Sequence, residues 1–343
     1  MTTQNQEKSF ENQHILLQPL YVGGLKIENR IWVAPMAGVT DNPFRRLAKS
    51  FGAGHAVSEM IIADTALYAR QKSLYRANFS GEIAPISAQV AGAEPDKLAQ
   101  AVRFQVENGA CIVDINMGCP AKKVCRKLAG SALLQDLDLV KRLLDSAVES
   151  VADLDVPITL KTRLGFANGQ ENILTIAHIA EQAGISALAI HGRTREDFYT
   201  GNARYELIKE VKANAKIPII VNGDIDSPQK AKWVQEYTEA DAVMIGRAGQ
   251  GRPWIFRDIA HYLATGELLP EPSVSELRQI VLTHLDELYQ FYGEYSGCRI
   301  ARKHIAWYTG GLPNSNAFRE AMYQEETTSG QYKVVDKFLS TGC

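Results

Sequence analysis

Short β-rich runs alternate with longer amphipathic segments along most of this chain, and this alternation constrains the fold more than any other feature. Eight runs are predicted to be strands: IWVAP (31–35), HAVSE (55–59), PISAQV (85–90), CIVDIN (111–116), PITLKTR (157–163), ALAIHG (187–192), PIIVNG (218–223) and DAVMIG (241–246). Their spacing leaves room for one helix after each, which is typical of βα units around a parallel sheet. Eight such units close into a TIM (β/α)8 barrel, whereas an open doubly wound sheet usually has a Gly-rich turn after its first strand, and no GxGxxG follows IWVAP.

The chain changes character after Trp254, where the strand pattern stops and apolar residues recur at helical spacing. We therefore predict three parts: an N-terminal extension (1–22), a TIM barrel (23–255) and a C-terminal all-helical domain (256–343). Within the barrel, the same periodicity predicts one helix from about Ser131 to Val151.

Charge and cysteine content exclude several classes of protein. The net charge of -2 provides no overall positive field to attract nucleic acid, so any RNA contact has to be local. The five cysteines include no CxxC and no closely spaced Cys/His set, so we expect no metal site and reduced thiols in the cytoplasm. Residues 1–22 lack a hydrophobic signal core, and no segment approaches the roughly 20 apolar residues that span a bilayer, so we expect no membrane insertion. A monomer is the default expectation.

Polar residues follow the predicted strands at their C-terminal ends, where the active sites of TIM barrels lie. Strands seven and eight end in NGDI (222–225) and IGRAGQGRPW (245–254), and glycine-rich exits at these two strands commonly bind phosphate. Gly223, Gly246 and Gly249 would allow close approach and Arg247 would add charge, although glycines also simply make tight turns. With APMAG (34–38) and Gln89 available to contact a ring, the pattern favours flavin mononucleotide (FMN).

Lys161 and His191 are candidate ionisable groups beside such a cofactor. Lys161 lies in an otherwise apolar strand, where an unpaired ammonium is costly, so it needs an anionic partner. A structural salt bridge would satisfy Lys161, and so would the N1 and O2 edge of a reduced flavin. His191, at the exit of the next strand, could reach the phosphate or a pyrimidine ring, or could be a hydrogen-bonded structural residue.

Cys119 is the candidate catalytic residue. It follows Met117 and Gly118 in a loop at the catalytic face, where a purely hydrophobic role fits poorly, in contrast to Cys111 in strand four. A thiol with an ordinary pKa of about 8.5 is mostly protonated at neutral pH and can deliver a proton. A nucleophilic role is the alternative, but no obvious general base neighbours Cys119 in the sequence.

Two small basic clusters are candidate contacts to a polyanion. The run AKKVCRK (121–127) contains Lys122, Lys123 and Arg126. One helical face of the C-terminal part contains Arg299, Arg302 and Lys303. Such clusters are most often solvated surface, and residues 256–343 carry 8 Lys and Arg against 11 Asp and Glu, so RNA binding there would use one face only.

Eight sequence blocks resemble those of one known family: APMAGVTDNPFR, VSEM, NMGCPAKKV, RKLAGSALL, LKTRLG, HGRTR, NGDI and MIGRAGQGRPWIF. In this order they look like the signature blocks of the tRNA-dihydrouridine synthases, over about residues 19–308. KKVxRKLAGSALL together with RIARKHIAWY (299–308) resembles the B type. Cys125 departs from the pattern, which has Asn there, and the N-terminal segment looks longer than usual.

The resemblance implies an FMN enzyme that uses NADPH or NADH to reduce the C5=C6 bond of particular D-loop uridines in tRNA. Hydride from the flavin would reach C6, and Cys119 would donate the proton to C5. The implied cofactor contacts are Pro35, Met36, Ala37, Gln89, Lys161, His191, Asn222, Gly223, Asp224, Gly246 and Arg247. Asn116 and Arg163, with Arg193 nearby, are the implied contacts to the pyrimidine, which has to be extruded from the RNA. The helical domain would hold the tRNA.

Two other functions remain open on the sequence. An FMN-dependent TIM-barrel reductase of a small pyrimidine-like substrate would share the phosphate site and Lys161, but it would not require AKKVCRK or a helical domain. A non-catalytic RNA-binding protein would leave Cys119, Lys161 and both glycine-rich exits unexplained.

Overall fold

Parallel strands form the centre of the molecule. The computed structural model describes residues 13–64, 70–125 and 129–341. Its parallel strands are β3 (Ile31–Val33), β4 (His55–Ala56), β5 (Ile61–Ile62), β6 (Ser87–Ala91), β7 (Ile112–Met117), β8 (Ile158–Arg163), β9 (Ala187–His191), β10 (Ile219–Asn222) and β11 (Ala242–Ile245). All eight runs predicted from the sequence form strands, and β5 is an additional short strand that follows the second of them.

The order of the strands produces a closed barrel. Neighbours follow the order β4-β3-β11-β10-β9-β8-β7-β6-β5, and all these pairings are parallel. Beyond β4, a parallel bridge joins Val57 to Ser87, and Ser58 N donates to Ser87 O at 2.9 Å. Because β4 leads directly into this bridge to β6 and β5 follows it, the two short strands share one position of an eight-position ring. The predicted TIM barrel is confirmed.

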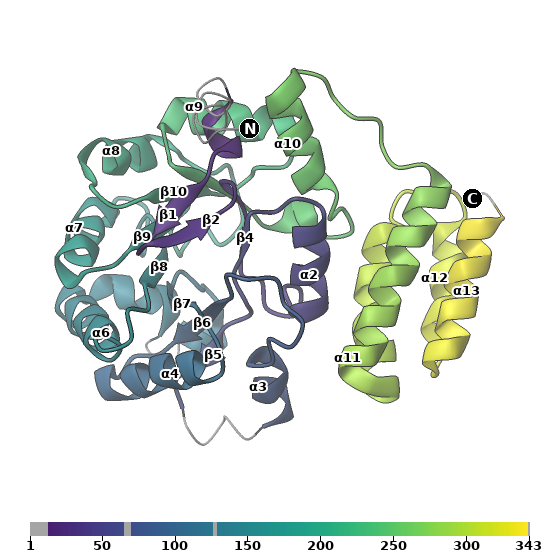
Figure 1. The fold of residues 1–343 in the computed structure, drawn as a ribbon, viewed down its shortest axis with the longest axis horizontal. Coiled ribbons are helices and arrows are strands. Elements are labelled where there is room, and N and C mark those ends of the chain that lie inside the picture. The colour runs from purple at the N-terminus through teal and green to yellow at the C-terminus, as the bar shows by residue number, and fades with distance from the viewer. Residues whose placement is uncertain (1–12, 65–69, 126–128, 342–343) are drawn as a thin grey trace, which may run out of the picture.

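Helices surround the ring of strands (Figure 1). They are α2 (Asn42–Ser50), α3 (Gln71–Arg76), α4 (Pro95–Glu107), α5 (Lys122–Cys125), η3 (Gly130–Gln135), α6 (Leu137–Glu149), α7 (Ile173–Ala183), α8 (Glu206–Asn214), α9 (Pro228–Thr238), η4 (Arg247–Gly249) and α10 (Ile255–Thr265). The single helix predicted from Ser131 to Val151 is divided into η3 and α6. Asp136 begins α6 by accepting a hydrogen bond from Leu139 N at 2.9 Å, which satisfies an N–H group that a helix start otherwise leaves free.

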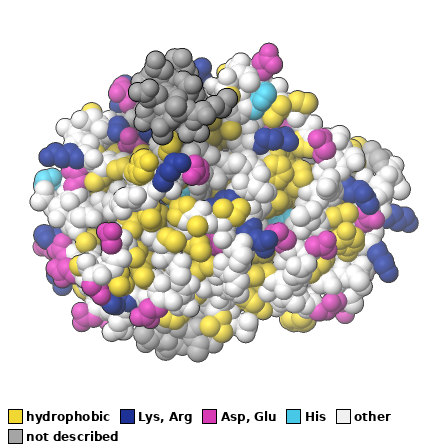
Figure 2. Space-filling view, viewed as in Figure 1, with side chains coloured by type: hydrophobic (Ala, Val, Ile, Leu, Met, Phe, Trp, Pro, Cys, Tyr) yellow, Lys and Arg dark blue, Asp and Glu magenta, His cyan; other side chains and the backbone are white. Residues whose placement is uncertain are grey.

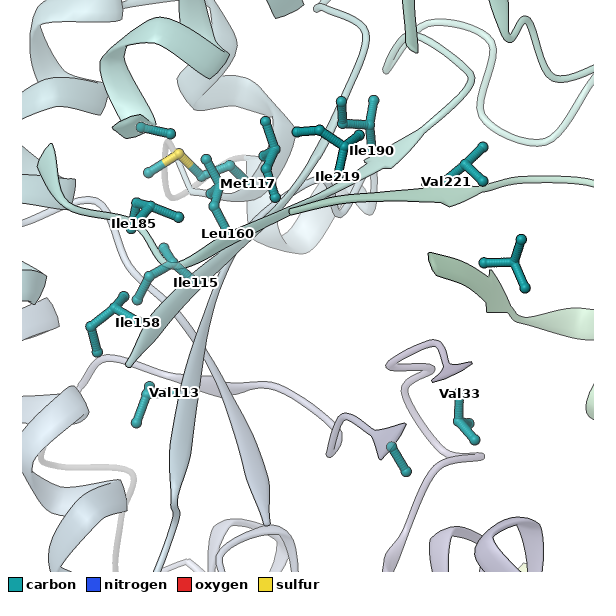
Figure 3. Close-up of a cluster of buried hydrophobic side chains, with 14 of the residues drawn as sticks. Val33, Val113, Ile115, Met117, Ile158, Leu160, Ile185, Ile190, Ile219 and Val221 are labelled. Carbon is teal, nitrogen blue, oxygen red and sulfur yellow. The ribbon is translucent and has the colours of Figure 1, made fainter. Parts of the chain in front are cut away.

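Strand residues alternate between two buried environments. Apolar side chains such as Val113, Ile115 and Leu160 belong to the large core that includes the surrounding helices (Figure 3). Polar neighbours near the C-terminal strand ends are also buried: Asn116, Lys161, His191 and Asn222. Because successive side chains of a strand point to opposite faces, the apolar stripe on the outside brings these polar side chains to the barrel interior.

A small antiparallel hairpin packs on the barrel at the N-terminal ends of the strands. β1 (Leu20–Val22) pairs with β2 (Leu25–Ile27) after the short helix η1 (Ile15–Leu17). Val22 and Ile27 are fully buried and share one apolar cluster with Trp32 and Ile112. The last residues of the predicted N-terminal extension therefore contribute to barrel packing.

Three helices beyond the barrel form a second apolar core, beside the barrel in Figure 1. They are α11 (Val274–Tyr308), α12 (Ser315–Gln324) and α13 (Thr328–Ser340). α11 begins with a capping box between Ser273 and Glu276 and kinks at Gly293, whose φ is 72°. Phe256 of α10 still packs in the barrel core, whereas Leu277 of α11 packs in the second core. The domain boundary at residue 256 stays a prediction.

Charged side chains of both signs are interspersed over the face seen in Figure 2. This mixture agrees with the net charge of -2. Within residues 13–64, 70–125 and 129–341, no helix combines the length and apolarity needed to cross a membrane, and no group of three or more His, Cys, Asp or Glu is placed to hold a metal ion.

A pair of buried histidines lies where α11 packs against α2. The rings of His284 and His304 have centroids 4.8 Å apart, and Phe44 of α2 contacts both. His284 Nδ1 lies 2.9 Å from the Tyr308 hydroxyl, whereas neither ring nitrogen of His304 has a partner in the described part of the chain. Burial lowers the pKa of His284 to about 3 and that of His304 well below 6.5, so both rings are neutral at pH 7.

We expect His304→Phe to reduce the loss of stability in acid. Below the ordinary His pKa of 6.5, the unfolded chain binds protons at both histidines that the folded chain excludes. The free energy of unfolding therefore falls with falling pH, by about 1.4 kcal/mol per pH unit for each histidine. Phe at position 304 removes the contribution of one of the two histidines. It removes no hydrogen bond, because neither ring nitrogen of His304 has a partner in the described part of the chain. Urea unfolding at several pH values between neutral and mildly acidic measures the slope, and a slope equal to that of the wild type would contradict this expectation.

Candidate active site

A cavity of about 880 Å³ opens at the C-terminal ends of the strands, within the range of about 300–1,000 Å³ typical of cofactor and ligand sites. Of the predicted cofactor contacts, it is lined by Pro35, Met36, Lys161, His191, Asn222, Gly223, Asp224, Gly246 and Arg247. Arg193 also lines it, whereas Ala37 and Gln89 are not among the lining residues. The exits of β3, β9, β10 and β11 therefore meet in one cavity with Lys161 of β8, whereas Asn116, Cys119 and Arg163 are not among its lining residues.

Lys161 brings a positive charge to this cavity. Its Nζ donates to Asn222 Oδ1 at 3.1 Å, and Asn222 Nδ2 donates to Met244 O at 2.7 Å. Burial, and then the neighbouring charge of Arg163, lower the pKa of Lys161 to about 8. The hydrogen-bond partner of Lys161 is thus a neutral amide, and an anionic ligand in the cavity would stabilise the ammonium.

A buried chain of hydrogen bonds runs from β6 to the loop that carries Cys119. Gln89 Nε2 donates to Asp114 Oδ2 at 2.7 Å, and Asn116 Nδ2 donates to Gln89 Oε1 at 2.8 Å. Asn116 Oδ1 in turn accepts from Gly118 N at 3.1 Å and from Cys119 N at 2.9 Å. Gln89 and Asn116 therefore hold the backbone of the candidate catalytic residue, a role that the sequence did not indicate.

The environment of Cys119 keeps its thiol protonated. Burial raises the pKa of the thiol, a backbone N–H group at Ala121 opposes this, and the nearby Cys125 raises the pKa again. Cys119 O accepts hydrogen bonds from Ser131 N at 3.1 Å and Ser131 Oγ at 2.9 Å, while Cys125 Sγ lies 3.6 Å from the same oxygen. Since nucleophilic attack needs the thiolate, a raised pKa favours proton donation over nucleophilic catalysis.

The exits of β10 and β11 leave room for an anion. A Cβ added to Gly246 would meet no atom closer than 3.8 Å, so this position opens onto the cavity. At Gly223, with a φ of 122°, a Cβ would lie 2.9 Å from Ala203 Cβ and 3.0 Å from the His191 ring, so only glycine fits. In the described part of the chain, no backbone oxygen accepts from the N–H groups of Gly246 and Arg247. Unpaired N–H groups beside glycines are typical of phosphate sites.

Asp224 joins two arginines on the cavity wall. Arg193 Nη2 donates to Asp224 Oδ2 at 2.7 Å, and Arg247 Nη2 donates to Asp224 Oδ1 at 3.1 Å. Burial opposes ionisation, but hydrogen bonds from Arg193 and Ala203 lower the pKa of Asp224. The Arg193 side chain is 1% exposed and that of Arg247 is 53% exposed, so Arg247 is the cation with room to meet a ligand.

His191 is neutral in this setting. Its Nε2 lies 3.3 Å from Arg193 Nη1. Burial, and then the charges of Arg163 and Lys161, lower the pKa of His191 well below 6.5. A neutral ring can accept or donate one hydrogen bond at each nitrogen, which leaves both of its predicted contacts, phosphate and pyrimidine, open.

Arg163 links the Cys119 loop to the segment after β9. Its Nε donates to Gly118 O at 2.8 Å, and its Nη1 donates to Thr194 O and Phe198 O, both at 2.8 Å. Only 1% of Arg163 is exposed, because these backbone groups surround the guanidinium. Arg163 therefore fixes the position of Gly118, and its predicted contact to a pyrimidine stays a prediction.

Two tyrosines on the cavity wall were missed by sequence reasoning. Tyr199 is 52% exposed, and the guanidinium carbons of Arg163 and Arg247 lie 5.4 and 4.9 Å from its ring centroid. The Tyr205 hydroxyl donates to Gly223 O at 2.6 Å. Both follow HGRTR (191–195), and an aromatic residue soon after a catalytic strand exit was the available signal.

The two basic clusters lie in different settings. Lys122 and Lys123 begin α5, close after Cys119 in the chain, and Arg126 lies outside the described residues. On α11, the three predicted contacts differ in exposure: Arg299 is exposed, and Arg302 and Lys303 are half-buried. Their contacts to RNA stay predictions.

Comparison with protein families gives one match that spans most of the chain. The family model described as "Dihydrouridine synthase (Dus)" matches residues 32–341. A protein of Xanthomonas campestris pv. campestris named tRNA-dihydrouridine synthase B is 54% identical over 320 residues, which cover 93% of this chain and 96% of that protein. Proteins of the same name from Pseudomonas aeruginosa and Vibrio cholerae are 53% and 51% identical, over 93% of this chain and 95% and 98% of theirs.

Solved structures of other enzymes share the fold. A complex of 2-naphthoyl-CoA reductase aligns with a TM-score of 0.55 and 14% identity, over 72% of this chain and 52% of that one. The old yellow enzyme homologue of Zymomonas mobilis aligns with a TM-score of 0.51 and 15% identity, over 75% of this chain and 94% of that one. At such low identity the likeness concerns the fold alone.

Proposed function

Because this chain belongs to the dihydrouridine synthase family, we propose that it is an FMN-dependent oxidoreductase that reduces the C5=C6 bond of uridines in tRNA, with NADPH or NADH as reductant. Relatives of 51% to 54% identity, named tRNA-dihydrouridine synthase B, support the tRNA substrate. The observation that carries the proposal is the cavity at the strand ends, where Lys161, His191 and Arg247 meet the backbone at Gly223 and Gly246.

The cavity fits FMN by the chemistry of its donors. Gly223 and Gly246 leave the backbone accessible, and unpaired N–H groups together with Arg247 would hold the phosphate. Lys161 would stabilise negative charge on the isoalloxazine, with Met36 against the ring. The flavin, when bound, supplies the hydride that adds to C6 of the uridine.

The residues around Cys119 control the proton. Addition at C6 leaves an electron pair conjugated with the C4 carbonyl, and the Cys119 thiol would donate its proton to C5. Asn116 holds the backbone of Cys119, and Arg163 holds that of Gly118, so the loop that carries the thiol is fixed at two points. The raised pKa keeps the proton on sulfur at neutral pH.

A uridine in folded tRNA has to leave its stack to reach this cavity. In the proposal, α11 to α13 hold the tRNA, with Arg299 as an exposed candidate contact. Lys122, Lys123 and Arg126 would meet phosphates close to the catalytic loop. The choice of D-loop uridines, a monomeric state and a cytoplasmic location stay predictions from the sequence.

The rival functions account for less of the chain. A reductase of a small pyrimidine-like substrate has no evident use for α11 to α13, yet the family match extends to residue 341. A non-catalytic RNA-binding protein does not explain why Lys161, His191 and Arg247 line one cavity with Gly223 and Gly246.

Reoxidation of the reduced enzyme without oxygen tests the proposal. Protein reconstituted with FMN is reduced with NADPH and then mixed with unmodified tRNA, while flavin absorbance is followed. We expect the absorbance of oxidised flavin to return with this tRNA and not with tRNA that already contains dihydrouridine. Reoxidation by a small pyrimidine alone would favour the small-substrate reductase, and failure to bind FMN would favour the non-catalytic protein.

A further inference from the structure

Lys303 reaches from the helical domain to the loop after β3. It lies on α11 and is half-buried, with Nζ 3.5 Å from the point that a Cβ on Gly38 would occupy. Gly38, with a φ of 75°, comes directly after Met36 and Ala37, which are predicted cofactor contacts. The ammonium of Lys303 in the helical domain therefore lies against residues 36–40 of the barrel, which we call the cofactor loop.

Two buried carboxylates of the barrel lie near this ammonium. Asp41 is 4% exposed and Glu59 is 6% exposed. Glu59 Oε1 accepts a hydrogen bond from Gly38 N, and Asp41 Oδ2 accepts one from the hydroxyl of Tyr292, also on α11, at 3.0 Å. Burial lowers the pKa of Lys303, and the charges of Asp41 and Glu59 oppose this change. The positive charge of Lys303 therefore interacts with two carboxylates of the barrel.

The cofactor loop is a tight turn whose later residues, Val39 and Thr40, are buried in the barrel, whereas Gly38 at its tip is half-buried. Inside the turn, Met36 N donates to Thr40 Oγ1 at 2.8 Å, and Val39 N and Thr40 N each donate to Met36 O at 3.0 Å. These bonds set the shape of the turn, Arg45 Nη1 donates to Thr40 O at 2.7 Å, and the bond from Gly38 N to Glu59 ties the tip of the turn to the barrel.

Glu59 Oε1 also has one cationic partner in the barrel, because Arg76 Nη2 lies 3.3 Å from it. Since an isolated buried charge is costly, a second cation would stabilise the two carboxylates of Glu59 and Asp41 together.

We propose that Lys303 is a positioning residue for the cofactor loop: together with Arg76, its ammonium balances Glu59 and Asp41 across the domain interface and so holds residues 36–40 in the place that FMN requires. This role rests on the proposed function, because it assumes that the cavity binds FMN. It differs from the RNA contact predicted for Lys303, and it makes docking of the helical domain a condition for a complete cofactor site.

The test measures FMN affinity of the full-length protein in the absence of RNA. Lys303→Met keeps the length of the side chain and removes its charge, and we expect the dissociation constant for FMN to rise about tenfold. Lys333→Met is the matched control, because Lys333 is an exposed lysine of the same domain, on α13, and we expect its FMN affinity to equal that of the wild type. Quenching of flavin fluorescence on binding gives the constant, and thermal unfolding of the apoproteins compares stability.

A double-mutant cycle with Glu59→Gln identifies the path of the effect. If Lys303 acts through Glu59, the double variant Lys303→Met/Glu59→Gln should bind FMN no more weakly than the weaker single variant. If Lys303→Met alone fails to fold, the double variant removes one of the unbalanced carboxylates, and its affinity should still be about tenfold below that of the wild type.

The outcomes separate the two proposals. Additive losses in the cycle, or wild-type FMN affinity in Lys303→Met, would overturn the positioning role, even where binding of tRNA is weakened. Absence of FMN binding by the wild type would instead overturn the proposed function itself.

Discussion

Replacement of Cys119 by alanine is expected to lower the rate of uridine reduction by about 10²- to 10⁴-fold, which is the usual contribution of a positioned proton donor. Burial raises the pKa of this thiol, so the wild type carries the proton at neutral pH, and alanine has none to give. Asn116 and Ser131 bond the backbone of residue 119, so the loop should keep its shape. FMN binding and NADPH oxidation should therefore persist.

Cys111→Ala is the matched control for this experiment. Cys111 directly precedes β7, at the end of the strand opposite to Cys119. Single-turnover formation of dihydrouridine, with the flavin reduced beforehand, isolates the step that uses the proton. Equal rates in the two alanine variants would remove Cys119 from the donor role.

Lys161→Met is expected to weaken FMN binding and to lower uridine reduction by about 10²- to 10³-fold, because it removes a buried ammonium from the cavity. Methionine has a similar length, so little space is opened, but Asn222 loses the donor to its Oδ1. Without the ammonium, negative charge on the cofactor lacks its partner in a buried site.

The matched control is Lys216→Met, because Lys216 is an exposed lysine shortly before β10. Equilibrium dialysis gives the FMN affinity of each variant, and anaerobic mixing of the reduced forms with tRNA gives the rate. Wild-type affinity and rate in Lys161→Met would show that the cavity charge has no part in the reaction.

The barrel and most of its cavity could be predicted because they depend on local patterns. Alternation within each strand fixes which side chains point inward, and the C-terminal ends of parallel strands meet at one face. Lys161 and Asn222 lie 61 positions apart in the chain, yet each could be placed from its own strand. The family resemblance and the strand exits then indicate the same cavity.

The contacts that support the site could not be predicted, because they depend on pairings between distant segments. The family resemblance implied that Asn116 and Arg163 contact the pyrimidine, but the structure also shows them bonding the backbone of the Cys119 loop. Nothing local to Lys303 indicates that Gly38 lies beside it, since this contact depends on how α11 packs on the barrel. The division between η3 and α6 was missed for another reason. Apolar residues recur at helical spacing on both sides of Asp136, so the sequence pattern does not reveal that Asp136 caps a new helix.

Mass spectrometry of tRNA tests the central claim most directly. Unmodified tRNA is incubated with the purified protein, FMN and NADPH, then digested and compared with tRNA from a reaction that lacks the protein. We predict that one or more D-loop uridines gain the mass of two hydrogen atoms, and that the gain is lost with Cys119→Ala. Flavin-dependent consumption of NADPH with no change in the tRNA would contradict the assigned reaction.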